Sequence, residues 1–205
     1  MKMSKVWKKV VAGVLAAACV VSSVAAPAKK AEAAKSYTAY LMYASGDWSI
    51  SNMNKNVGNT KVTKSGGTYT VTLKKSDIYK KNADKDSCQW PEGVKQAEGA
   101  MVFNVDVTDI MKKYGVKLSD SDDKKAKAGK NVKVSNVSVK VDGKPLKINA
   151  KKLNQGWIES GEGQGYNYRL EIYNEYGDTK GNPCYDFTKL KWKKSLSVSF
   201  KITYK

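Results

Sequence analysis

Alternation of apolar and polar residues dominates this chain and predicts β-strands. In residues 67–74, Tyr69, Val71 and Leu73 alternate with threonines. A period of two places such sets on opposite faces of a sheet, one toward the core and one toward solvent. Comparable strands are predicted for residues 101–107, 166–175 and 195–204, and for residues 37–44, which are apolar on both faces.

The segment 131–143 alternates with a change of phase. Its valines occupy even positions before Ser135 and odd positions after Asn136. One extra residue near this point would return the valines to the inward face, which is what a β-bulge does. The dipeptide Asp142-Gly143 then predicts a tight hairpin turn.

Helical pattern is scarce. Residues 108–115 could form two turns, with Thr108 or Asp109 as the N-terminal cap and Gly115 as the stop. Many short strands with little helix predict an all-β protein, a two-sheet antiparallel β-sandwich of jelly-roll type with one short helix. An open barrel is the alternative.

The N-terminus has the three-part layout of a secretory signal peptide. Lysines come first, an apolar run covers residues 10–26, and small residues follow. We therefore expect a signal peptide over residues 1–34 and one secreted β-sandwich domain over 35–205, extracellular or associated with the cell wall. Two alternatives are a retained anchor, which the short Ala-rich run disfavours, and lipidation of Cys19.

The predicted mature domain is strongly basic. Removal of six lysines and Glu32 leaves 31 basic and 18 acidic residues, a net charge of +13. Such a surface attracts anionic polymers, although a lysine-rich coat is also common on soluble secreted proteins. We expect no nucleic acid partner, because Arg169 is the only arginine and the lysines are dispersed. No second apolar run could span a membrane.

Cys88 and Cys184 remain after cleavage, an even pair for an oxidising compartment. Both lie in turn-like segments, so we predict that they form a disulfide. It would close a loop of roughly a hundred residues and stabilise the fold by about 4 to 5 kcal/mol in the chain-entropy model. Two separate buried or free thiols are the alternative.

Four stretches carry a family resemblance: YTAYLMYASGDWSI, GTYTVTL, RLEIYNEYG and LKWKKSLSVSFKITY. They resemble a jelly-roll β-sandwich module of secreted proteins of Gram-positive bacteria, which is similar to carbohydrate-binding modules. The resemblance implies a β-sandwich and glycan binding, and it transfers no individual binding residue.

The residues themselves suggest where a sugar would bind. A sugar site needs flat apolar rings against the C–H face and a few fixed hydrogen-bonding groups. The strand at 166–175 directs four polar side chains around one ring, and neighbouring Gly- and Pro-bounded loops carry further rings, including Tyr176. Each indole could instead be a core residue, and the charges could form a cross-strand network. The predicted ligand-binding residues are Trp48, Trp90, Trp157, Asn167, Arg169, Glu171, Tyr173 and Glu175.

The sequence gives little support for an enzyme active site or a metal site. The chain has no histidine, which excludes Ser-His and Cys-His nucleophile pairs. Glu171 and Glu175 would lie about 13 Å apart along one strand at ~3.3 Å per residue. Glycosidase carboxylates are closer, at ~5–5.5 or ~6.5–9.5 Å. Asp120, Asp122 and Asp123 form the one obvious acidic cluster, and a solvated loop is favoured there over a structural calcium site.

The sequence therefore predicts a monomeric, non-catalytic, secreted β-sandwich without a cofactor that binds polysaccharide or cell-wall glycan. The alternative is a cationic cell-wall interaction or adhesion module that binds anionic polymers, and a glycoside hydrolase is the third hypothesis.

Overall fold

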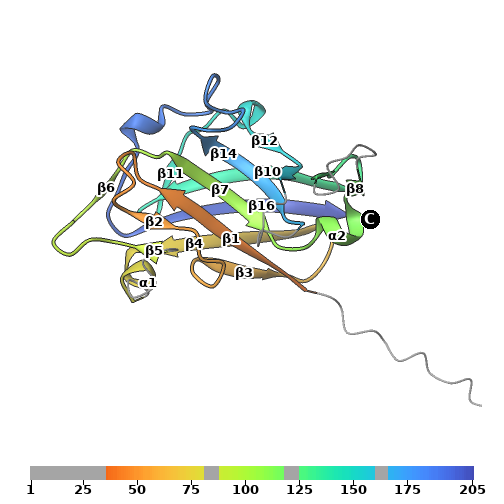
Figure 1. Ribbon diagram of the computed structural model, residues 1–205, viewed down its shortest axis with the longest axis horizontal. Coiled ribbons are helices and arrows are strands. Elements are labelled where there is room, and N and C mark those ends of the chain that lie inside the picture. The colour runs from red at the N-terminus through yellow and green to blue at the C-terminus, as the bar shows by residue number, and fades with distance from the viewer. Residues whose placement is uncertain (1–35, 81–87, 118–124, 160–165) are drawn as a thin grey trace, which may run out of the picture. The chain divides into compact units, whose positions relative to one another are not determined.

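Antiparallel sheets stacked around a shared hydrophobic core make up the fold (Figure 1). The computed structural model describes residues 36–80, 88–117, 125–159 and 166–205, which all belong to one unit. The predicted signal peptide at 1–34, Cys19 and the acidic cluster at 120–123 lie outside the described residues. The fold is mostly β, as predicted, and consistent with an all-β sandwich, whereas a jelly-roll strand order is not confirmed.

The larger sheet has the strand order β12-β14-β7-β1-β2-β5, with β3 also paired to β1. The second sheet has the order β11-β10-β16-β4, and smaller sheets join β13-β9-β8 and β15-β6. In Figure 1, β1, β7 and β14 cross in front of β4, β10 and β16. The strands are β1 (Tyr37–Ala44), β2 (Ser51–Asn52), β3 (Asn59–Val62), β4 (Gly67–Lys74), β5 (Cys88–Gln89), β6 (Ala97–Glu98), β7 (Val102–Val107), β8 (Val116–Lys117), β9 (Lys125–Lys127), β10 (Val132–Val141), β11 (Lys144–Leu146), β12 (Asn154–Gln155), β13 (Trp157–Glu159), β14 (Tyr168–Asn174), β15 (Lys191–Trp192) and β16 (Ser195–Tyr204).

The apolar residues of the alternating strands form the core. Val71 and Leu73 of β4 are fully buried, and so are Val198 and Phe200 of β16. They belong to the same cluster as Leu41 and the inward residues of β7 and β14. The second sheet therefore buries one face, while its outer face carries threonine, serine and lysine.

The predicted bulge and hairpin in β10 are confirmed. The pairing of β10 with β16 shifts register between Ser135 and Ser138, and Asn136 has a left-handed backbone with φ of 53°. Asp142 and Gly143 both have positive φ, at 49° and 82°, and join β10 to β11. Asparagine and glycine tolerate such angles better than other residues, so the sequence supports both features.

A second bulge, in β14, was not predicted. Glu171 pairs with Asn104 and Tyr173 pairs with the next residue, Phe103, so Ile172 is the extra residue. A shift of one residue moves the following side chains to the other face of the sheet. Tyr173 accordingly packs with the core-facing residues, and the prediction that it shares a face with Arg169 and Glu171 is wrong.

The helical segments also differ from the prediction. The helix expected over 108–115 is the short α2 (Met111–Tyr114), preceded by Asp109 in a left-handed conformation with φ of 56°. The sequence analysis missed α1 (Lys75–Lys80), which directly follows β4. Two short 3-10 turns are Ala150–Lys152 and Phe187–Lys189.

The predicted disulfide between Cys88 and Cys184 is wrong. Both side chains are buried but not joined. The Cys88 thiol points to the carbonyl of Ile78 at 3.9 Å and the Cys184 thiol to that of Ile172 at 3.5 Å. Among the described residues, no helix has the length and apolarity needed to cross a membrane.

Candidate ligand-binding site

The outer face of the larger sheet carries the polar ladder that the sequence indicated. Across β1, β7 and β14, Tyr40 pairs with Asp106, which pairs with Arg169. The Arg169 guanidinium donates two hydrogen bonds of 2.8 Å to the Asp106 carboxylate, a bidentate pair. Burial opposes the charged form of Arg169, but Asp106 outweighs it and raises the pKa of Arg169. Arg169 is therefore held by its own chain.

Glu171, the next residue of this polar ladder along β14, holds the loop that follows the strand. Glu171, which is 8% exposed, accepts hydrogen bonds from the backbone N–H and the hydroxyl of Thr179, at 2.9 and 2.8 Å. A Cβ at Gly177 would meet the Glu171 carboxylate at 2.6 Å, so a side chain there would displace this carboxylate. Glu171 thus holds the loop after β14 in place, and its predicted role of facing a ligand does not fit this burial.

Tyr173 and Glu175 interact with each other and with the chain. The Tyr173 ring stacks on Phe187, with centroids 4.8 Å apart and planes 20° apart. Its hydroxyl donates to the Glu175 carboxylate, which also pairs with Lys180 at 2.7 Å. Burial and then Glu175 raise the pKa of Tyr173 to about 12. These side chains are half-buried parts of the fold.

Trp90 is an interior residue, and its predicted exposure is wrong. The indole is fully buried, packs edge-to-face on Trp192 with centroids 5.0 Å apart, and donates to the carbonyl of Val94 at 2.7 Å. Asn167 is also buried, and its side-chain oxygen accepts from the N–H of Asp109 at 3.0 Å. Trp157 begins β13, and its side chain lies outside what the structure describes.

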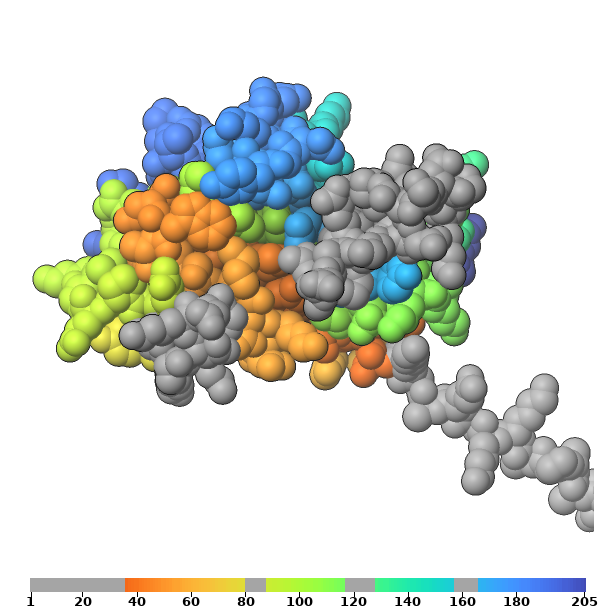
Figure 2. Space-filling model, viewed as in Figure 1, coloured from red at the N-terminus to blue at the C-terminus, as the bar shows by residue number. Residues whose placement is uncertain are grey.

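Among the predicted rings that the structure describes, Trp48 and Tyr176 are the exposed ones. They come from different loops, one between β1 and β2 and the other after β14, yet their centroids are 6.3 Å apart with planes tilted by 38°. Trp48 is 40% exposed and Tyr176 is 72% exposed. Figure 2 shows the two loops, orange and blue, meeting on the face that lies over β1 and β7.

A network of hydrogen bonds fixes the Trp48 loop. The Asp47 carboxylate accepts from the Ser45 and Ser49 hydroxyls and from the Ser49 N–H, at 2.6, 2.8 and 3.0 Å. These bonds lower the pKa of Asp47 to about 2. The Gln89 side chain donates to the Trp48 carbonyl at 2.7 Å.

Within this loop, Trp48 has a φ of 62°. A left-handed backbone is a strained conformation for a bulky residue and costs about 1–3 kcal/mol.

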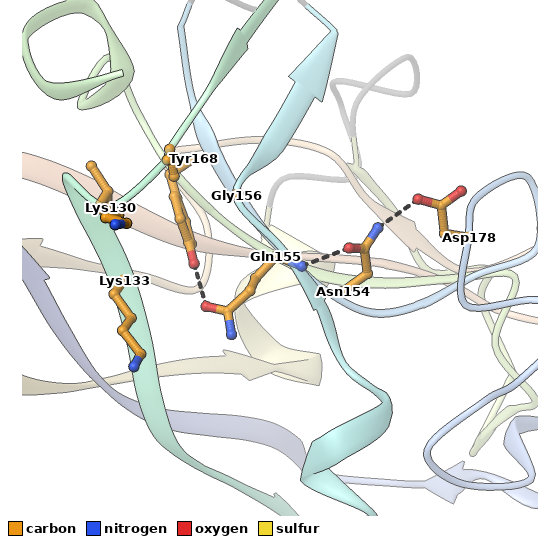
Figure 3. Close-up of a pocket in the computed structure, with 10 residues that line it drawn as sticks. Lys130, Lys133, Asn154, Gln155, Gly156, Tyr168 and Asp178 are labelled. Carbon is orange, nitrogen blue, oxygen red and sulfur yellow. Dashed lines mark hydrogen bonds between the residues drawn. The ribbon is translucent and has the colours of Figure 1, made fainter. Parts of the chain in front are cut away.

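A separate cavity of about 1000 Å³ lies at the edge of the sandwich, beside β12 and the first half of β10 (Figure 3). The Gln155 side-chain oxygen accepts from the Tyr168 hydroxyl at 2.6 Å and from the N–H of Val134 at 3.1 Å. Asn154 donates to Asp178 at 2.8 Å. Sequence patterns gave no sign of this cavity, because its side chains come from three segments that only folding brings together.

The described part of the chain offers few groups of side chains suited to metal binding or acid–base catalysis. No group of three or more His, Cys, Asp or Glu side chains there could hold a metal ion. Glu171 and Glu175, the two glutamates considered for hydrolysis, both interact with neighbouring side chains. Glu171 accepts a hydrogen bond from the Thr179 hydroxyl, and Glu175 forms an ion pair with Lys180.

No protein family, curated protein or solved structure matches this chain. The described residues define an antiparallel β-sandwich. The outer face of its larger sheet is mostly buried, and the exposed aromatic pair lies on two adjoining loops.

Proposed function

We propose that this protein is a secreted, non-catalytic β-sandwich that binds carbohydrate through Trp48 and Tyr176. The observation that carries the proposal is the exposed Trp48 in a left-handed backbone, within a loop whose hydrogen bonds maintain that conformation. Strain of this kind persists where the surrounding structure enforces it, and it clusters at ligand-binding sites.

The chemistry of the ring pair fits a sugar ligand. The faces of indole and phenol rings offer flat apolar surface to the C–H face of a pyranose. Two rings 6.3 Å apart and tilted by 38° can contact successive parts of an extended chain. Asp47 and Ser49 flank Trp48 along the chain, so hydrogen-bonding groups adjoin this ring.

The engagement of Glu171 and Glu175 by Thr179, Tyr173 and Lys180 supports a binding role over hydrolysis. A general acid or nucleophile needs a carboxylate that faces the substrate. The N-terminal signal pattern supports export, so the partner would be a polysaccharide or cell-wall glycan outside the cell.

The proposal is tested by affinity electrophoresis and calorimetry of the mature protein against a panel of neutral plant and wall glycans. We expect at least one glycan to bind the wild type, and binding to be lost in Trp48→Ala and in Tyr176→Ala. Val116→Ala is the control, because Val116 is also an exposed apolar side chain, at 45%, but lies on β8. Absence of binding to every glycan, or equal losses in all three variants, would reject the proposal.

A further inference from the structure

Five lysines surround a second cavity, of about 1010 Å³, between α1, the loop that precedes β6 and the loop between β15 and β16. They are Lys74, Lys75, Lys95, Lys193 and Lys194. Tyr79 and Val94 add apolar surface, and the aliphatic stems of the lysines extend it. Among the residues that the structure describes, no acidic side chain lines this cavity.

Lys75 is fixed in position. Its ammonium donates to the carbonyl of Val94 at 2.8 Å and lies 4.7 Å from the centroid of the Trp90 ring. Trp90 itself donates to the same carbonyl of Val94. The indole that the sequence suggested as a sugar platform therefore supports a cation from below.

The loop that carries Lys193 and Lys194 is also fixed. The Asp142 carboxylate, from the β10–β11 hairpin, accepts from the backbone N–H groups of Lys193, Lys194 and Ser195 at 2.6–3.1 Å. Burial acts against the charged form of Asp142, but these amides prevail and lower its pKa. This carboxylate is bound to the backbone, and both lysine side chains extend from a constrained loop.

The positive charge in the cavity is only partly offset by Asp142, whose carboxylate interacts electrostatically with Lys194. Within the described ranges, Lys74, Lys95, Lys193 and Lys194 form no ion pair. The nearest acids along the chain, Asp77 and Glu92, do not line the cavity. The lysines around this concave surface create a positive potential that favours an anionic ligand.

We propose that this cavity binds a segment of an acidic polymer, a glycan or polyol chain that carries repeated carboxylate or phosphodiester groups. Its volume suits a ligand of several monomers rather than a single small ion. The anionic groups would contact the lysine ammonium groups, and the carbon skeleton would lie against Tyr79, Val94 and the lysine stems. The site does not depend on the proposed role of Trp48 and Tyr176.

The test uses the mature protein with polygalacturonate as the carboxylate polymer and polyglycerol phosphate as the phosphodiester polymer. Binding is measured by calorimetry and affinity electrophoresis at two salt concentrations. We expect at least one polymer to bind, more weakly at higher salt because exposed charges are screened. The polymer that binds identifies which anionic group the site accepts.

The decisive comparison is between two double variants of equal charge. Lys193→Gln with Lys194→Gln should weaken binding about tenfold, as expected for the loss of two exposed charge contacts. Lys140→Gln with Lys147→Gln, on exposed lysines of β10 and the segment after β11, should leave affinity within about twofold of wild type. Equal losses in both pairs would indicate net charge alone and overturn the proposal, as would no binding of either polymer.

The two proposals can be rejected independently of each other. Trp48→Gly should retain binding to short fragments of the acidic polymer, because Trp48 does not line the lysine cavity. Loss of binding to these short fragments in Trp48→Gly, with far-UV circular dichroism unchanged, would place the binding at the aromatic pair and reject the cavity. Absence of neutral-glycan binding alone would reject the carbohydrate proposal and leave the cavity intact.

Discussion

At the residue scale, Trp48 combines strain with exposure. An exposed indole with φ of 62° contributes little burial to stability, so its backbone conformation is a net cost to the fold. Glycine adopts this conformation without steric penalty. At Trp48, the stability of the fold therefore conflicts with the proposed ligand binding.

This conflict can be measured by comparing Trp48→Gly with Trp48→Ala. Both variants lose the indole, so they differ mainly in how they tolerate a positive φ. We expect Trp48→Gly to be more stable than Trp48→Ala by about 1 kcal/mol in urea unfolding. Equal stabilities would show that the loop relaxes to an ordinary φ once the indole is removed, and would refute the strain argument.

Asp47 makes the same loop sensitive to acid. Its pKa is about 2 in the folded protein against 3.8 for the unperturbed group, because the Ser45 and Ser49 bonds favour the carboxylate. Its contribution to stability is complete above pH 3.8 and is lost as the pH falls through about 2. The difference in free energy of unfolding between wild type and Asp47→Asn should shrink over this window. A difference that stays constant down to pH 2 would contradict the assigned hydrogen bonds.

At the element scale, the two bulges show what an alternation pattern can reveal. In β10 the valines change phase at the bulge, so the extra residue is visible in the sequence and confirmed in the register. In β14 the residues on either side of Ile172 are compatible with unbroken alternation, so nothing marks the shift that turns Tyr173 toward Phe187. The pattern predicted the strand but not the face of its second half.

The β10 bulge gives a direct stability prediction at Asn136. Its side chain is exposed, so substitutions there act mainly through the backbone, whose φ is 53°. Asn136→Val should destabilise the protein by about 1–2 kcal/mol, since β-branched residues resist the left-handed region. Asn136→Gly should be near neutral. The exposed neighbour Ser138, outside the shift, serves as the control, and Ser138→Val should change stability by less than about 0.5 kcal/mol.

The sequence also could not reveal which residues pack against one another in the interior. Trp48 and Trp90 both lie in loops bounded by glycine or proline, and local sequence does not distinguish them. Trp90 is buried because Trp192, which lies about a hundred residues further along the chain, packs on its ring, and only folding creates that contact. The polar ladder of Arg169 and Glu171 was predicted with the correct face, but its burial depends on loops whose course the pattern does not fix.

At the scale of the whole molecule, stability comes from the shared core and not from a cross-link. Burial raises the pKa of the Cys184 thiol to about 11, which keeps it protonated and unreactive at neutral pH. We expect the melting temperature of the mature protein to be unchanged by a reductant. A thiol reagent should label Cys184 slowly in the native state and rapidly in denaturant. A fall in melting temperature on reduction would instead show that Cys88 and Cys184 pair in solution.

The two proposed sites together suggest how the molecule would hold an acidic polysaccharide. Gln89 bonds to the Trp48 carbonyl, and the next residue, Trp90, lies beneath Lys75, so one short segment supports both sites. A long chain that occupied both sites would gain effective concentration at the second site once the first is bound, whereas a short fragment could occupy only one. For short acidic fragments, Lys193→Gln with Lys194→Gln should weaken binding and Trp48→Ala should leave it unchanged, because a fragment occupies only the lysine cavity. For long chains, either change alone should weaken binding by more than it does for fragments, because each also removes the tethered second contact. Fragment length is therefore the variable to titrate, and effects that do not change with length would mean that the two sites bind separate ligands.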